Sequence, residues 1–161
     1  MSEGLNPTRR YKWFRPRQAA RGRARLAGPI NTATVALFNN ALGRKVMIVR
    51  AMQLGGSGGS NVVTSYQKGS FGGAPGIVQP LVPESQTPPG LLTTLDSVTV
   101  YPGDFSIANA AAGDAWWEHD FPFAVIPSGW SLVLQQGAVT RTIDCSLMWE
   151  SIDEDQLDFM D

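Results

Sequence analysis

Residues 121–150 decide the fold, and they read FPFAVIPSGWSLVLQQGAVTRTIDCSLMWE. Near the end of this stretch, apolar residues alternate with other residues, as in a strand that buries one face. These apolar residues are Ile143, Cys145, Leu147 and Trp149. Pro-Ser-Gly and Gly-Ala-Val-Thr are turn signals that divide the stretch into segments. We therefore predict strands over 121–126, 130–136 and 143–150, with the last two paired as an antiparallel hairpin.

Similar short runs recur towards the N-terminus, and they are rich in β-branched and apolar residues. They predict strands over 32–38, 45–54, 62–68, 97–101, 105–108 and 115–118. Strict alternation in 45–54 would place Val46, Ile48, Met52 and Leu54 on one face. Since the other face is also apolar, we expect this strand at the centre of a sheet or at a subunit contact.

Residues 69–90 contain five prolines, which cannot donate to a sheet ladder. We expect a long loop or an edge segment here, ordered against the body or used as a functional surface.

About eight short strands at roughly ten-residue spacing are typical of a β-sandwich or small barrel. We predict an all-β fold, a jelly-roll-like β-sandwich, because the Pro- and Gly-rich crossings suit long connections between two sheets. The composition changes from Arg-rich to apolar at Gly28-Pro29. We therefore divide the chain into a basic N-terminal arm (1–28), the sandwich (29–150) and an acidic C-terminal tail (151–161).

The arm carries eight Arg or Lys residues and one acid, a net charge of +7. Arginine and aromatic residues are enriched at protein interfaces, and both also suit nucleic acids. Arg17, Arg21 and Arg25 would share one face of a short helix after Pro16. The candidate partner-binding residues of the arm are Arg9, Arg10, Tyr11, Lys12, Trp13, Phe14, Arg15, Arg17, Arg21, Arg23 and Arg25.

Residues 150–161 carry six acids and no base. We expect the arm of one subunit to reach this tail on a neighbour, and the alternative is that the arm is disordered and solvated. The candidate partner-binding residues of the tail are Asp153, Glu154, Asp155, Leu157, Asp158, Phe159 and Met160.

Catalytic and metal-binding signatures are few. The chain has one cysteine, Cys145, on the apolar face of its strand, and one histidine, His119. We expect Cys145 to be a small buried side chain rather than a nucleophile. Ligand density is too low for zinc or iron, although a calcium loop near Asp104 or Asp114 is an alternative. We therefore expect no enzymatic activity, no cofactor and no metal.

Trp116 and Trp117 are adjacent, so a strand would turn one of them outward, towards an interface or a sugar. A bend that packs both rings inward is the alternative. No apolar run is long enough to span a membrane, and we expect no membrane partner.

The run FPFAVIPSGWSLVLQQG…TIDCSLMWE resembles the closing strands of jelly-roll virion proteins of tailed bacteriophages, in which a Pro-Ser-Gly corner leads into an LVLQ strand and the last strand ends in Trp-Glu. The resemblance implies a non-enzymatic capsid decoration (cement) protein. Such a protein would assemble in the host cytoplasm and reside in the virion. It would bind the major capsid protein or other virion subunits as a homo-oligomer, with a trimer favoured.

Three alternatives remain at this stage. The first is a tail, fibre, baseplate or head–tail connector component. The second is a nucleic-acid-binding protein that uses the basic arm, and the third is a carbohydrate-binding sandwich that uses Trp116 or Trp117.

Overall fold

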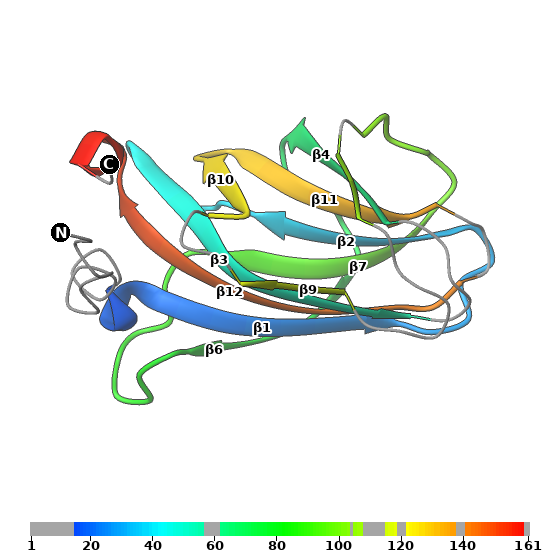
Figure 1. Cartoon of the computed structure of the whole chain (residues 1–161), viewed down its shortest axis with the longest axis horizontal. Helices are drawn as coiled ribbons and strands as arrows, with labels where there is room; N and C mark the ends of the chain where they lie inside the picture. The colour runs from blue at the N-terminus through cyan, green and yellow to red at the C-terminus, as the bar shows by residue number, and fades with distance from the viewer. Residues whose placement is uncertain are drawn as a thin grey trace, which may run out of the picture.

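The computed structural model describes residues 15–56, 62–103, 105–107, 115–118, 122–137 and 141–159. For residues 56, 105–107, 115–118, 158 and 159 it describes the backbone and not the side chain. The described chain forms two six-stranded antiparallel sheets packed face to face (Figure 1). The predicted all-β sandwich is therefore confirmed.

Sheet A has the order β10-β3-β12-β1-β6, with β9 also paired to β3. Its strands are β1 (Ala19–Leu26), β3 (Lys45–Gly56), β6 (Ile77–Pro80), β9 (Ala115–Glu118), β10 (Ala124–Pro127) and β12 (Ile143–Asp153). Sheet B has the order β5-β7-β2-β11-β4-β8. Its strands are β2 (Thr32–Phe38), β4 (Val62–Lys68), β5 (Ala74–Pro75), β7 (Leu91–Ser97), β8 (Phe105–Ile107) and β11 (Trp130–Gln136). Two short 3₁₀ helices are η1 (Pro16–Gln18) and η2 (Glu154–Phe159).

The strand pairs are nested along the chain. β1 pairs with β12, β2 with β11, β3 with β10, and β4 with β8, all antiparallel. Successive members of this series alternate between the sheets, so the first and last strands lie side by side inside sheet A.

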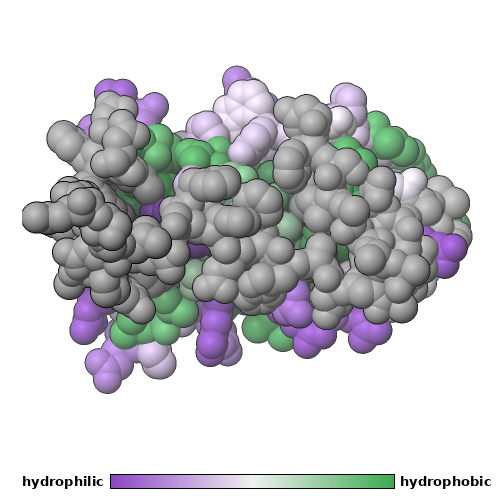
Figure 2. Space-filling view, in the orientation of Figure 1, coloured by the Kyte–Doolittle hydropathy of each residue, from purple (hydrophilic) through white to green (hydrophobic). Residues whose placement is uncertain are grey.

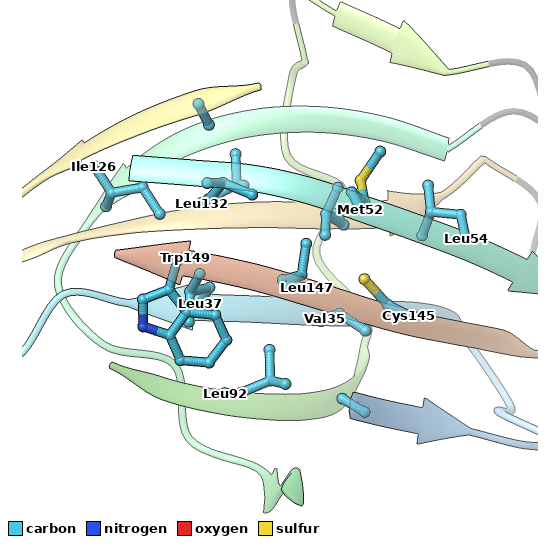
Figure 3. Packing of buried hydrophobic residues seen from close by; sticks show 14 of the residues in the cluster. Val35, Leu37, Met52, Leu54, Leu92, Ile126, Leu132, Cys145, Leu147 and Trp149 are labelled. Carbon is cyan, nitrogen blue, oxygen red and sulfur yellow. The ribbon is translucent and has the colours of Figure 1, made fainter. Parts of the chain in front are cut away.

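One hydrophobic cluster fills the space between the sheets (Figure 3). Trp149 is fully buried in it, and its indole N–H donates to the Pro89 carbonyl oxygen at 3.0 Å. The ring passes close to β1, because a Cβ added at Gly22 would lie 2.9 Å from both Trp149 and Leu92. Burying side chains of this size contributes about 2 kcal/mol each. Position 22 therefore needs a glycine so that β1 can pack over the indole.

A β-bulge in β3 corrects the predicted faces of this strand. The register shifts between Met148 and Trp149, which leaves Arg50 as an extra residue between Val49 and Ala51. One extra residue reverses the alternation beyond it. The core face of β3 therefore carries Met47, Val49, Met52 and Leu54. The prediction that β3 is a central strand with both faces partly covered is confirmed.

The predicted hairpin between 130–136 and 143–150 is wrong. Both segments are strands, but β11 pairs with β2 and β4 in sheet B, whereas β12 pairs with β1 and β3 in sheet A. Two consecutive strands that each bury one face can pair, or they can face each other across a core. Alternation alone does not separate these two outcomes.

The predicted strand over 97–101 is also wrong. The strand, β7, ends at Ser97, and the following residues cross the outer face of sheet B. Gln135 holds this crossing segment: its amide nitrogen donates to the Thr99 carbonyl oxygen at 2.9 Å, and its amide oxygen accepts from the Tyr101 N–H at 2.8 Å. Val98 and Val100 are 82% and 72% exposed, so these apolar residues are not part of the core.

The proline-rich segment 69–90 supplies edge strands to both sheets, as predicted for an edge segment. β5 lies beside β7 at the edge of sheet B, and β6 lies beside β1 at the edge of sheet A. Gly76 joins β5 to β6, and a Cβ there would approach the Arg23 carbonyl oxygen to 2.8 Å.

The sheet begins before the boundary that we placed at Gly28-Pro29. Ala19–Leu26, assigned to the basic arm, is strand β1 and lies between β12 and β6. The helix expected after Pro16 is limited to η1, so Arg21 and Arg25 belong to a strand. The small residues Ala20, Gly22 and Ala24 face the core, and they alternate with exposed arginines.

Candidate interaction surface

The exposed face of β1 carries a row of three arginines, Arg21, Arg23 and Arg25. Strand geometry places such alternate side chains on the same face about 7 Å apart. Three of the arginines predicted in the arm therefore share one face through the alternation of a strand and not through a helix.

Arg23 forms a two-point ion pair with Asp144 of β12. Its Nε and Nη2 donate to the two carboxylate oxygens at 3.0 and 2.6 Å. These hydrogen bonds, together with the charges of Arg23 and Arg25, hold the pKa of Asp144 below its ordinary value. Arg21 and Arg25 have no ion pair with any residue that the structure describes. The row therefore keeps an excess of positive charge.

A groove lies on the outer face of sheet A beside this row, with a volume of about 510 Å³. Its outward-facing lining comes from four strands and the residue after β6: Arg21, Arg23, Ala51, Gln53, Ile77, Gln79, Leu81, Ser146 and Met148. Ile77 is 69% exposed. Figure 2 shows hydrophilic and hydrophobic residues alternating along the lower edge, where Figure 1 places β6 and β1. The groove thus combines an apolar lining with positive charge.

The two ends of the described chain meet at one end of the sandwich, where Figure 1 places η1 and η2. The Arg15 backbone N–H donates to Glu150 Oε2 at 3.0 Å, and Arg15 Nη1 donates to Gln156 Oε1 at 2.9 Å. The remaining arm candidates, residues 9–14, lie outside the described residues. Arg17 lies exposed in η1.

Acidic residues of the tail bind bases of their own chain. Asp153 pairs with Lys45 at 3.1 Å and Glu154 pairs with Arg44 at 2.9 Å. Leu157 packs against a second small cluster, formed by Val46, Ile48 and Ile152 with Val125. Asp155 is exposed, whereas the side chains of Asp158 and Phe159, and all of Met160, lie outside the described part.

Sequence reasoning missed a buried ion pair beside the bulge. Glu150 is fully buried and accepts hydrogen bonds from Nε and Nη2 of Arg50 on Oε1. Its other oxygen binds Arg15, as described above. Alternation assigned Glu150 to a solvent-facing position, and only the bulge at Arg50 indicates that these two side chains meet.

The tryptophan pair lies on β9, where the backbone register sets Trp116 opposite Gln53 and Trp117 opposite Met52. Their side chains are outside the described part, so the predicted interface aromatic remains a prediction.

Reactive groups are sparse in the described part of the chain. Cys145 is fully buried, as predicted, and burial raises the pKa of its thiol well above its ordinary value. The described residues contain no group of three His, Cys, Asp or Glu side chains that could hold a metal ion. His119, Asp104 and Asp114 lie outside them. No helix in the described ranges is long and apolar enough to cross a bilayer.

Comparison with known proteins assigns no family. No protein-family model matches the chain, no curated protein matches it, and no solved structure matches it.

Proposed function

We propose that this chain is a non-enzymatic structural protein of a virion, specifically a capsid decoration protein that binds the shell as a homo-oligomer. The nested pairing of the strands supports this proposal most directly. In this chain the first strand pairs with the last, the second with the next to last, and so on inward. Nested pairing of this kind is typical of the jelly roll, a double-sheet architecture found in viral capsid proteins.

The arrangement of the chain ends supports attachment from one side. Arg15, where the described chain begins, is hydrogen bonded to Gln156 of η2. The exposed basic residue Arg17 of η1 and the exposed acidic residue Asp155 of η2 therefore belong to the same end of the sandwich, so both can contact neighbouring subunits there.

The test is co-sedimentation with heads assembled from the major capsid protein of the same particle. The full chain should sediment with heads, and a variant lacking residues 1–14 should remain folded but bind much less. Full binding by this variant would remove the role of the arm. A full chain that never sediments with heads would remove the decoration function.

The second candidate function is nucleic-acid binding, and Arg21 and Arg25 favour it because neither forms an ion pair with a carboxylate of the described chain. If several phosphates are contacted, affinity must fall steeply with salt. The logarithm of the binding constant should drop by about 0.7–0.9 per contact for each tenfold rise in salt concentration. Titration of DNA and RNA at several salt concentrations separates the two functions. A flat or absent response removes the nucleic-acid function.

A further inference from the structure

The groove on sheet A is built from two rows of residues in register across four strands. One row runs Gln79, Arg21, Met148 and Ala51, and the other runs Ile77, Arg23, Ser146 and Gln53. Four strands are separated by three spacings of about 4.8 Å, which makes the groove about 14 Å long across the sheet. A four-residue extended segment spans about 13 Å. The groove therefore matches a short peptide lying across the strands.

The chemistry of the groove favours a peptide with acidic and apolar side chains. Ile77, Leu81 and Met148 offer apolar contacts, while Arg21 offers a guanidinium that no described carboxylate neutralises. Arginine and methionine are enriched at protein–protein interfaces.

The chain itself contains a segment of this chemistry. Residues 158–161 read Asp-Phe-Met-Asp, two carboxylates around two large apolar side chains. The acids before them, Asp153 and Glu154, are paired with Lys45 and Arg44 of their own chain. Those two acids are already occupied, so the carboxylates that we assign to a partner's arginine are Asp158 and Asp161.

We propose that the groove of one copy binds residues 158–161 of a second copy of this chain, with a carboxylate at Arg21 and the apolar side chains over Ile77 and Met148. Residues 158 and 159 are the last two of η2, so they unwind from this 3₁₀ helix when the segment lies extended in the groove. This inference rests on the proposed function only in taking the partner to be another subunit. Because the contact joins two different surfaces, it is heterologous and can close into a ring or extend into a chain.

Sedimentation of the full chain at high protein concentration tests the proposal. The wild type should self-associate, and salt should weaken the association because an ion pair contributes. Arg21→Glu and Ile77→Ser should each weaken it on the order of tenfold. The matched controls are Arg141→Glu and Val98→Ser, which make the same chemical changes at exposed residues outside the groove lining. All four variants should keep the melting temperature of the wild type.

A mixing experiment identifies the occupant. Ile77→Ser damages the groove and leaves the acidic segment intact, whereas Asp158→Lys with Asp161→Lys does the reverse. Each variant alone should remain monomeric, and an equimolar mixture should form dimers. A mixture that stays monomeric would overturn binding between copies, because residues 158–161 of one variant would then not occupy the intact groove of the other. A monomeric wild type, or association unchanged in Arg21→Glu, would also overturn the proposal. So would equal weakening by Arg141→Glu.

Nucleic acid is tested in the same samples with a single-stranded oligonucleotide. Binding of the oligonucleotide that is lost in Arg21→Glu, with self-association unchanged, would overturn the proposal in favour of a nucleic-acid groove. Binding to heads is measured separately. If the Arg21→Glu variant is monomeric but still sediments with heads, the result supports both proposals. Self-association through the groove and binding to heads would then be two separate properties of the protein. Association without any binding to heads would support the groove and reject decoration.

Discussion

At the scale of single residues, the buried charge of Glu150 has the largest expected effect on stability. This side chain is fully buried, and its partner Arg50 is 13% exposed. Removing one member of such a pair leaves the other charge without compensation in a site of low dielectric. Glu150→Gln should therefore lower the free energy of unfolding by roughly 3 kcal/mol, measured by urea denaturation.

The double variant Arg50→Met with Glu150→Leu is the matched control for this prediction. It removes both charges together, and Arg15, whose backbone N–H loses its acceptor, is an exposed residue that water can reach. Replacing a whole buried pair by apolar residues is often neutral. The double variant should therefore be more stable than Glu150→Gln. If it is equally unstable or less stable, the loss reflects packing and not an uncompensated charge.

Asp144 makes stability depend on pH in the acidic range. Arg23 lowers the pKa of this carboxyl group in the folded state, so the folded protein holds the charged form more strongly than the unfolded chain does. The resulting stabilisation is complete above the ordinary Asp pKa of about 3.9 and is lost as the pH falls through the lowered folded value. Asp144→Asn should lower the melting temperature at neutral pH by on the order of 1 °C, because the pair is solvent-exposed.

The comparison with wild type should be made by thermal unfolding from pH 7 downward. The difference between the two proteins should shrink once the pH falls below about 4. A difference that persists unchanged at the acidic end would mean that the asparagine perturbs the strand by some route other than charge.

At the scale of elements, β1 and the bulge show what residue patterns can and cannot predict. The alternation of Ala20, Gly22 and Ala24 with arginines is a period-two signal, but its inner face is made of small residues. Strand prediction that relies on large apolar side chains therefore does not detect β1. These small residues are needed because Trp149 of the neighbouring strand occupies the space between the sheets. The size of the inner-face residues is therefore set by a strand more than a hundred residues away.

Truncation distinguishes a free arm from a strand of the sheet. Deleting residues 1–14 leaves η1 and β1 intact, so the variant should fold with a melting temperature near that of the full chain. Deleting residues 1–28 also removes β1, which would leave β6 without its partner strand, free one edge of β12 and uncover Trp149. We expect this variant to be unfolded or aggregated, as measured by circular dichroism and size-exclusion chromatography. A folded 29–161 fragment would contradict the role of β1 in the sheet.

At the scale of the whole molecule, the sequence predicts most of the strands and the sandwich, and it fails on how the strands are paired. The segments that became β2, β3, β4, β9, β11 and β12 were located by their composition and alternation. The pairing of strands depends on where their apolar faces lie around the common core. The apolar residues around Leu132 and Leu147 are compatible both with a hairpin and with two strands that face each other from different sheets. The groove could not be predicted for the same reason, because its rows join residues from strands distant in the chain.

This connectivity also predicts how the protein unfolds. The chain changes sheet repeatedly, from β1 to β2, from β2 to β3 and again from β10 to β11 to β12, so no cut along the sequence separates two independent sheets. One core cluster joins residues of both sheets, including Leu37, Leu132 and Trp149.

Unfolding in urea should therefore be a single cooperative transition for the sandwich. Tryptophan fluorescence, to which the buried Trp149 contributes, reports core packing, and far-ultraviolet circular dichroism reports the sheets. The two signals should give coincident midpoints and equal slopes against denaturant. Midpoints that separate would mean that one sheet survives the loss of the other. That behaviour would contradict a core shared between nested strand pairs, because β12 cannot leave sheet A without taking Trp149 out of the cluster.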